Sequence, residues 1–223
     1  MPQRLIFTEA DAAADAMTFV GRTSPLGDGA VRLRASDGVL VMTSAPLAPR
    51  GLLDATPTVL AMRVLTVDPE LVCDVTVSAS SLQRAHDDET SLELPETAVS
   101  EPWAGVTPPR TGWVTADDIP AATLAARAQW GITTVAQSLP ANPGEDVVRS
   151  VRAAVWGAAD NELNGLPLGA AFAAFALGFI AGEEQARVRT AASWTRITLD
   201  RGHVLIRRPG RMGLTEVRAT GKA

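Results

Sequence analysis

The residues best suited to chemistry lie around one turn near the end of the sequence: Asp200, Arg201 and His203. An imidazole titrates near neutral pH, and an adjacent carboxylate can orient its ring and raise its pKa, as a general base requires. If Gly202 adopts a left-handed conformation in a three-residue connection, Asp200 and His203 come within hydrogen-bonding reach. The same pairing would equally well hold a surface hairpin together. Asp200 and His203 are therefore the catalytic candidates, and their role depends on whether the turn opens into a cleft.

A second group of residues is suited to binding. Arg110 and Trp113 lie in the segment PRTGW, residues 109–113. Arginine makes planar, two-pronged contacts with anions, and tryptophan either lines a pocket or fills a gap. For Trp113 we favour a plug between the sheet and the first long helix over a pocket wall beside Arg110. Arg110, Trp113 and Arg201 are the ligand-binding candidates.

Motifs for metal, phosphate or nucleophilic chemistry are missing from the sequence. It contains no glycine-rich phosphate loop, no dinucleotide fingerprint and no nucleophile elbow. Two histidines and one cysteine cannot supply a structural zinc site. The run from His86 to Glu89 is acidic, but consecutive residues of one loop rarely converge on one ion. We therefore expect no metal and no cofactor.

Composition describes a chain that can bury a core. The 223 residues are 46% hydrophobic and 20% charged, with a net charge of −5. The start of the sequence turns acidic after a short apolar run and does not resemble a signal peptide. The single cysteine, Cys73, cannot form an internal disulfide and is expected to be a buried thiol. These features predict a cytoplasmic protein.

Residues 165–182 form the longest uncharged stretch, GLPLGAAFAAFALGFIAG. In a helix, Leu168, Phe172, Phe175 and Phe179 share one face beside a stripe of small residues. A membrane span is the rival interpretation. The high glycine content, the marginal length and the two glutamates at its end favour a buried helix, so we expect no membrane partner.

The remaining patterns predict an α+β fold: an antiparallel sheet covered by three or four helices, with a C-terminal β-hairpin. Turn residues between apolar runs predict several strands. Three helices are predicted before the uncharged stretch, one of them near the start of the chain. The predicted elements are a strand at residues 4–7, a helix at 8–20, hairpins at 30–43 and 59–78, a short strand at 91–94, helices at 119–139 and 143–157, and a hairpin at 194–208. If the last hairpin joins the N-terminal sheet, residues 1–223 form a single domain. A division into a β-rich half, 1–104, and a helical half, 110–223, is the alternative.

Charge is unevenly distributed along the chain. Residues 85–109 carry six acids and no base, whereas residues 185–223 are rich in arginine. The order of three helices and a basic hairpin is also that of a winged helix, whose wing and tail would contact phosphate through Arg196, Arg201, Arg207, Arg208 and Arg211. The third helix offers no polar side chain to a DNA groove, so we expect no nucleic-acid partner. We expect the acidic and basic segments to face each other, within one chain or across a dimer.

Several segments of the second half resemble an uncharacterised family of actinobacterial proteins. They are residues 109–113, 154–157, 165–174, 194–196 and 201–205. The resemblance covers roughly residues 109–208 and implies no activity. We therefore expect a protein of unknown function that binds or assembles without catalysis, as a homodimer. The alternative is an enzyme acting on a small anionic metabolite through Arg110, Arg201 and His203.

Overall fold

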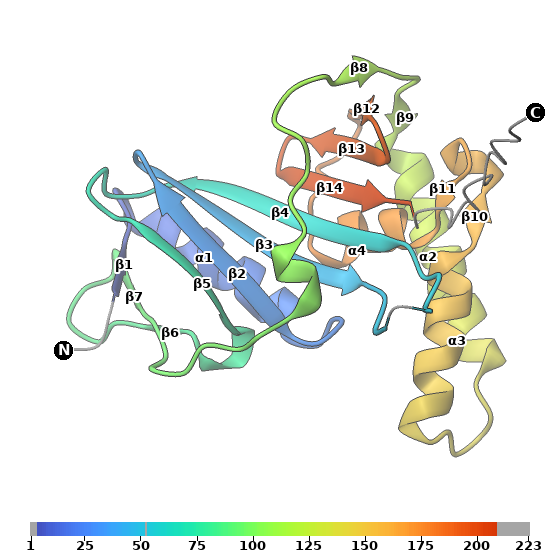
Figure 1. The fold of residues 1–223 in the computed structure, drawn as a ribbon, viewed down its shortest axis with the longest axis horizontal. Helices are drawn as coiled ribbons and strands as arrows, with labels where there is room; N and C mark the ends of the chain where they lie inside the picture. Colours follow the sequence, from blue (N-terminus) through green and yellow to red (C-terminus); the bar gives the residue numbers. More distant parts are fainter. Residues whose placement is uncertain (1–3, 52, 209–223) are drawn as a thin grey trace, which may run out of the picture.

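A computed structural model describes residues 4–51 and 53–208 of the chain. These residues form an antiparallel sheet of nine strands with four α-helices, which confirms the predicted α+β fold (Figure 1). The strand order is β5-β2-β3-β4-β14-β13-β12-β8, with β9 pairing β12. The nine strands are β2 (Ala30–Ser36), β3 (Val39–Leu47), β4 (Thr58–Thr66), β5 (Cys73–Ser78), β8 (Val114–Thr115), β9 (Ile119–Pro120), β12 (Gln185–Ala191), β13 (Trp194–Leu199) and β14 (Gly202–Arg207).

The C-terminal hairpin joins the N-terminal strands in the middle of this sheet. Strand β14 pairs with β13 on one side and with β4 on the other, with Leu205 opposite Leu60. The last hairpin therefore joins the N-terminal strands in one sheet, as the sequence suggested. Because β14 is paired along both edges, the hairpin is no free wing, and the resemblance to a winged helix ends there.

One predicted hairpin is wrong. Residues 30–43 form the expected β2–β3 hairpin, with Asp37 and Gly38 in the left-handed conformation. Strands β4 and β5, however, do not pair with each other: β4 lies between β3 and β14, and β5 pairs with β2. After β4, Val67 bridges Phe7, and the Asp68 N–H donates to the Ile6 carbonyl at 2.9 Å. These contacts carry the chain away from β4 before β5 begins.

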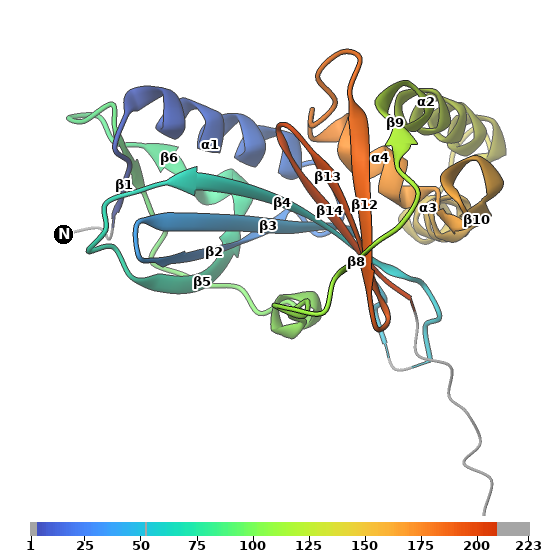
Figure 2. The ribbon, with the colours of Figure 1, turned by 90° about the horizontal axis from the view of Figure 1, so that it is seen from above.

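All four helices lie on one face of the sheet, called here the helical face (Figure 2). Its core joins both halves of the chain. Phe19 stacks on Phe179 with ring centroids 6.3 Å apart, and Trp156 stacks on Phe172 at 4.3 Å. The helices are α1 (Ala10–Thr23), α2 (Ala121–Ser138), α3 (Glu145–Gly157) and α4 (Gly169–Ala176).

The uncharged stretch is buried, but its helix is shorter than predicted. Helix α4 has eight residues, and Gly178 ends it with a φ of +70°. Arg22 of α1 donates from Nη1 to the Leu177 carbonyl at 2.8 Å, which satisfies one of the free carbonyls at the helix end. Phe175 is 38% exposed instead of buried. Within the described residues, no helix has the length and apolar character that a membrane crossing requires.

Helices α2 and α3 form a hairpin beside the sheet, and its two tryptophans differ. Trp156 is buried. Trp130 is 50% exposed, with the Arg127 guanidinium 4.4 Å from its ring centroid. Arg127 also pairs with the buried carboxylate of Asp160, Nε to Oδ2 at 2.9 Å. The residue next to Trp130, Gly131, faces α3 instead, and the Trp156 ring packs against Gly131.

Smaller elements complete the fold. Strand β7 runs between β1 and β6 in a three-stranded sheet, and β10 pairs with β11. Short 3₁₀ turns, called η, connect several elements. These elements are β1 (Arg4–Ile6), β6 (Gln83–Arg84), β7 (Ser91–Glu93), β10 (Ala159–Asp160), β11 (Leu166–Pro167), η1 (Ala79–Ser81), η2 (Pro102–Gly105) and η3 (Asn161–Leu163).

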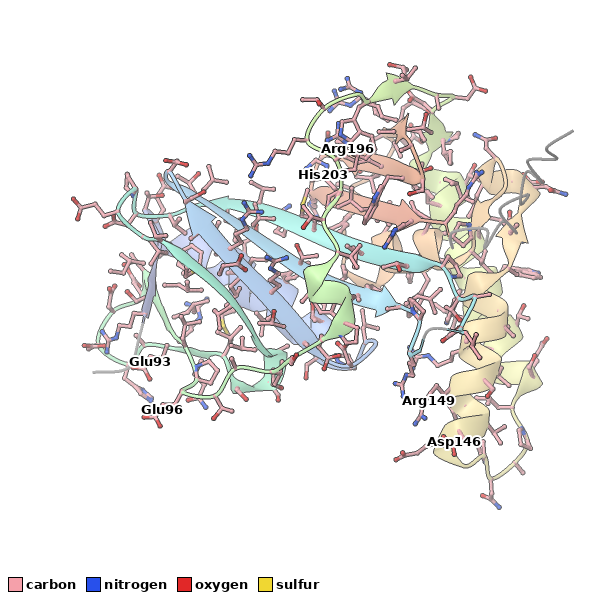
Figure 3. The ribbon with its side chains drawn as sticks, viewed as in Figure 1. Glu93, Glu96, Asp146, Arg149, Arg196 and His203 are labelled. Carbon is pink, nitrogen blue, oxygen red and sulfur yellow. The ribbon has the colours of Figure 1, made fainter. Side chains whose placement is uncertain are left out.

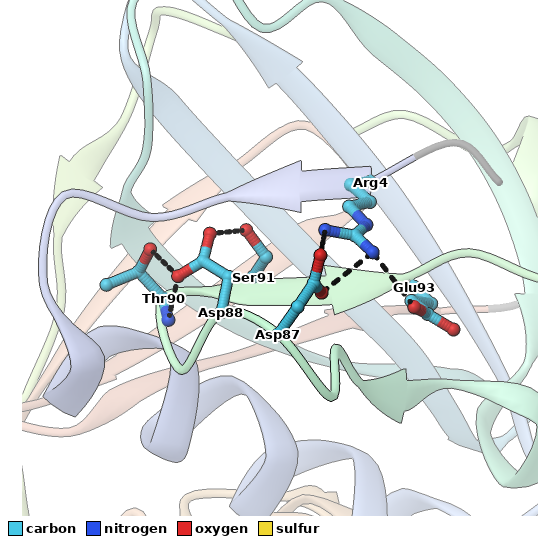
Figure 4. A network of polar contacts seen from close by, with 6 residues as sticks. All are labelled: Arg4, Asp87, Asp88, Thr90, Ser91 and Glu93. Carbon is cyan, nitrogen blue, oxygen red and sulfur yellow. Dashed lines mark hydrogen bonds and ion pairs between the residues drawn. The ribbon is translucent and has the colours of Figure 1, made fainter. Parts of the chain in front are cut away.

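The acidic segment 85–109 begins beside strand β1 rather than beside the basic hairpin. Asp87 and Glu93 both pair with Arg4, at 2.9 and 3.3 Å (Figure 4). Hydrogen bonds from Ser91 and Thr90 lower the pKa of Asp88 to about 2. Among the described residues, no ion pair joins segment 85–109 to residues 185–208. The expected pairing within one chain is therefore absent there, and residues 209–223 lie outside the described part.

Candidate functional site

The face of the sheet opposite the helices, called here the open face, is crossed by residues 99–113. Three contacts fasten this crossing segment. The Val99 N–H donates to the Thr76 carbonyl at 2.8 Å, and Trp103 Nε1 donates to the Asp28 carboxylate at 2.6 Å. Arg32 donates to the Ala104 carbonyl while its other nitrogens pair with Asp74. The segment therefore forms a fixed roof over part of the open face.

A cleft of about 310 Å³ lies between the open face and the crossing segment. Its floor is apolar and comes from three neighbouring strands. Its rim and roof carry arginines, tryptophans and prolines. The lining residues are Arg32, Arg34, Val41, Thr43, Leu60, Met62, Trp103, Ala104, Val106, Thr107, Pro108, Pro109, Arg110, Trp113, Arg196 and Leu205. The volume is at the lower end of the range for small-molecule sites, about 300–1,000 Å³.

Arg196 and Trp113 stack on each other in this cleft. The Arg196 guanidinium lies 4.6 Å from the centroid of the Trp113 ring. The ring is held in turn by a hydrogen bond from its Nε1 to the Pro109 carbonyl at 3.0 Å. Cation–π stacking of this kind fixes the plane of the guanidinium. The interpretation of Trp113 as a plug against the first long helix is wrong, because Trp113 lines the cleft together with Arg110.

The charged side chains that line the cleft are all arginines. No carboxylate is among its lining residues in the described part of the chain. Within that part, Arg34, Arg110 and Arg196 make no ion pair, and the buried Nε of Arg196 has no hydrogen-bond partner. Burial and the neighbouring Arg189 lower the pKa of Arg196. A partly buried guanidinium without a counter-charge is unfavourable, so the cleft favours an anion.

His203 adjoins this cleft without lining it. In the sheet His203 lies between Thr198 of β13 and Met62 of β4, and Met62 belongs to the floor. Figure 3 places Arg196 and His203 next to each other beside the crossing segment. His203 Nδ1 lies 3.1 Å from the Thr198 hydroxyl. Burial lowers the pKa of His203, and the nearby cations of Arg196, Arg187 and Arg63 lower it further.

The expected pairing of Asp200 with His203 is wrong. Gly202 pairs with Leu199, so the turn has two residues instead of three, and Gly202 has no positive φ. The Asp200 N–H donates to Glu184 at 2.8 Å, and Thr198 takes the place beside the imidazole. Gly202 is needed for another reason: a Cβ there would lie 2.6 Å from the Phe179 ring. Without the carboxylate, the predicted rise in the pKa of His203 becomes a fall.

The low pKa of His203 leads to a prediction about pH. An unfolded histidine has a pKa of about 6.5, so between that value and the lower folded pKa the unfolded state binds more protons. The contribution of His203 to stability is therefore complete above about pH 6.5 and decreases as the pH falls through this window. Replacing Arg196 by glutamine should raise the pKa of His203 because it removes a positive neighbour. Proton NMR of the imidazole, assigned with His203→Gln, measures the pKa of His203 in both proteins. An unchanged pKa would mean that the charge of Arg196 does not act on His203.

Arg201 lies at a different site. It lines a cavity of about 160 Å³ on the helical face, together with Arg22 and Arg63. The other arginines of this cavity have partners: Arg22 donates to the Leu177 carbonyl, and Arg63 donates to Asp15 at 2.9 Å and to the Arg201 carbonyl. Arg110 and Arg201 therefore lie in separate cavities, and the predicted set of Arg110, Arg201 and His203 does not form one site.

Sequence reasoning missed most of the cleft. Arg32 and Arg34 alternate with buried Leu33 along β2, a pattern that places both arginines on the open face. Arg196 alternates in the same way with buried Ile197 in β13. Each strand therefore shows on its own that its arginines share one face. The cleft, however, also depends on the order of the strands in the sheet, which no local pattern specifies.

Two family models match the chain in succession. Residues 1–105 match a domain of unknown function, DUF8010, and residues 108–211 match a second domain of unknown function, DUF8185. Each match covers just under half of the 223 residues. The resemblance over residues 109–208 to a family of unknown function is thus confirmed. The two matches meet within the crossing segment, and the lining of the cleft comes from both matched regions.

Among solved structures, bacterial sliding clamps are similar to this chain, at low sequence identity. The DNA polymerase sliding clamp of Caulobacter crescentus is 10% identical, with a TM-score of 0.47, and the match covers 99% of this chain and 69% of that one. The sliding clamp of Bartonella birtlesii, bound to griselimycin, is 11% identical, with a TM-score of 0.49, covering 92% of this chain and 65% of that one. No curated protein sequence matches the chain.

The acidic run at residues 86–89 is engaged in other contacts. Asp87 pairs with Arg4, and Asp88 accepts hydrogen bonds from Thr90 and Ser91. Within residues 4–51 and 53–208, no three or more His, Cys, Asp or Glu side chains are grouped as a metal ion would require.

Proposed function

We propose that this chain is a non-catalytic binding protein whose site is the cleft between the open face and the crossing segment, and whose ligand is a small anion. One observation carries the proposal. Arg34, Arg110 and Arg196 surround an apolar cleft, and none of them has a carboxylate partner among the described residues. Arginine is the side chain best adapted to planar recognition of carboxylate and phosphate groups.

The lining supports binding more than catalysis. In the described part of the chain it holds no Asp, Glu, His, Cys, Ser or Lys side chain. Arginine stays protonated in proteins and is a poor general base. The enzyme alternative needed Arg110, Arg201 and His203 together, and these residues are divided between the cleft, its margin and the opposite face.

The test is isothermal titration calorimetry with inorganic phosphate at constant ionic strength. We expect saturable binding to the wild-type chain and at least about tenfold weaker binding to Arg196→Gln, because a charge-assisted contact contributes about 1.5–3 kcal/mol. Arg201→Gln serves as the control, since Arg201 lies on the helical face, and it should bind like wild type. Equal binding by all three proteins would refute the proposed site.

We also propose that the protein is a cytoplasmic homodimer and that its two halves unfold as a single domain. Exposed apolar side chains on the α2–α3 hairpin support self-association: Trp130 is 50%, Ile132 41% and Val147 44% exposed. Pairing of β4 with β14 supports cooperative unfolding. Sedimentation velocity should show a dimer for wild type and a monomer for Ile132→Asp. A monomeric wild type at about 100 µM would contradict a stable dimer, whose Kd we place well below that value.

A further inference from the structure

The floor of the cleft limits what a ligand can be. Val41, Leu60, Met62 and Leu205 come from β3, β4 and β14 and present adjoining apolar side chains to the cavity. Leu60 and Leu205 are direct cross-strand partners and are almost completely buried. The part of the floor that water reaches is therefore Val41 and Met62, which are half-buried. A bare inorganic ion would satisfy the arginines and leave these two side chains against water. A ligand with an apolar body would cover them and gain the free energy of apolar burial.

The charged group has a defined place above this floor. Arg196 lies opposite Leu205 in the sheet, so its side chain rises directly beside the apolar surface. Its guanidinium is held against Trp113, and its buried Nε has no partner among residues 4–51 and 53–208. Arg34 and Arg110 are exposed at the rim. The partly buried cation therefore lies within reach of the floor, and the other two lie toward the mouth.

We infer that the cleft takes a small amphiphilic anion, whose apolar body rests on Val41, Leu60, Met62 and Leu205 and whose carboxylate or phosphate pairs with Arg196. This inference rests on the proposed function and adds the class of ligand. The fixed guanidinium and the fixed roof mean that little ordering is needed on binding. Charge and apolar surface act together, so neither part of the ligand alone should bind as well as the whole.

Three probes separate the two contributions. 2-Naphthoate carries both parts, 2-naphthalenemethanol carries the apolar body alone, and inorganic phosphate carries the charge alone. By titration calorimetry at constant ionic strength, wild type should bind 2-naphthoate at least about tenfold more tightly than either of the other two.

Two variants assign the contributions to residues. Arg196→Gln should weaken 2-naphthoate at least about tenfold, and Met62→Gln should weaken 2-naphthoate while leaving phosphate unchanged. Met62 is only half-buried, so the fold should tolerate glutamine, and circular dichroism checks this for each variant. Arg201→Gln should match wild type for every probe.

The outcomes distinguish this inference from the function on which it rests. Equal affinity for 2-naphthoate and phosphate would overturn the amphiphilic ligand and leave an anion site in place. Equal affinity for 2-naphthoate and 2-naphthalenemethanol would overturn the role of Arg196. Binding of none of the probes would overturn both the inference and the proposed function.

Discussion

Replacing Arg127 by methionine is expected to lower the free energy of unfolding by about 3 kcal/mol. Asp160 has a side chain only 8% exposed, and Arg127 is its ion-pair partner. Asp160 also accepts a hydrogen bond from the Glu162 N–H at 2.9 Å at the start of η3, so its carboxylate cannot move to solvent without disturbing that turn. Methionine keeps the apolar stem and removes the charge, which leaves a buried carboxylate without a counter-ion. Urea denaturation measures the change.

A matched control lies on the neighbouring helix. Arg149 of α3 pairs with Asp146 at 2.8 Å, and both side chains lie on the exposed part of the α2–α3 hairpin (Figure 3). The Asp146 side chain is 94% exposed, so water screens the pair. Arg149→Met should therefore change the free energy of unfolding by about 0.5 kcal/mol or less. Equal losses in the two variants would mean that burial of Asp160 is not what gives the Arg127 pair its strength.

Gly131→Ala is expected to destabilise the protein by about 2 kcal/mol, although alanine normally stabilises a helix. A Cβ at Gly131 would lie 2.2 Å from the Trp156 ring and 2.8 Å from Leu168. Trp156 is stacked on Phe172 and cannot withdraw without disturbing α4. The small residue therefore sets the distance between α2, α3 and α4.

The comparison is Gly21→Ala in helix α1. Gly21 is exposed, and a Cβ there would meet no atom within 4 Å. This substitution should stabilise the protein by about 0.5–1 kcal/mol, because only the helix preference changes. Thermal and urea unfolding of the two variants should therefore give changes of opposite sign. A stabilised Gly131→Ala would mean that the interface between α2 and α3 is loosely packed.

Local patterns were enough to predict most elements. The Asp37-Gly38 turn identified one hairpin, and the helices predicted at 119–139 and 143–157 lie nearly at the observed bounds of α2 and α3. The pairing of β5 with β2 could not be predicted, because the contacts of Val67 with Phe7 and of Asp68 with Ile6 separate β5 from β4. The missed strand β12 has a clear alternation, with Ala186 and Val188 buried between exposed residues.

The site was predictable only in part, for a related reason. Arg110 and Trp113 could be predicted to act together because both lie in the short segment 109–113. Arg196 lies beside Trp113 because β13 pairs with β12 and β12 pairs with β8, the strand that directly follows Trp113. The Asp200–His203 pair depended on the length of one turn. A single residue in that length decided whether Asp200 or Thr198 lies beside the imidazole.

The indole N–H signal of Trp113 in a proton–nitrogen correlation spectrum tests the binding cleft most directly. Of the five tryptophans, Trp113 stacks under Arg196 in the cleft, whereas Trp130 lies on α2 outside it. Titration with phosphate at constant ionic strength should shift the Trp113 signal, assigned by its loss in Trp113→Phe, until it saturates, and should leave Trp130 in place. In Arg196→Gln the shift should disappear. A Trp113 signal that stays still, or that moves only as much as that of Trp130, would contradict an anion-binding cleft.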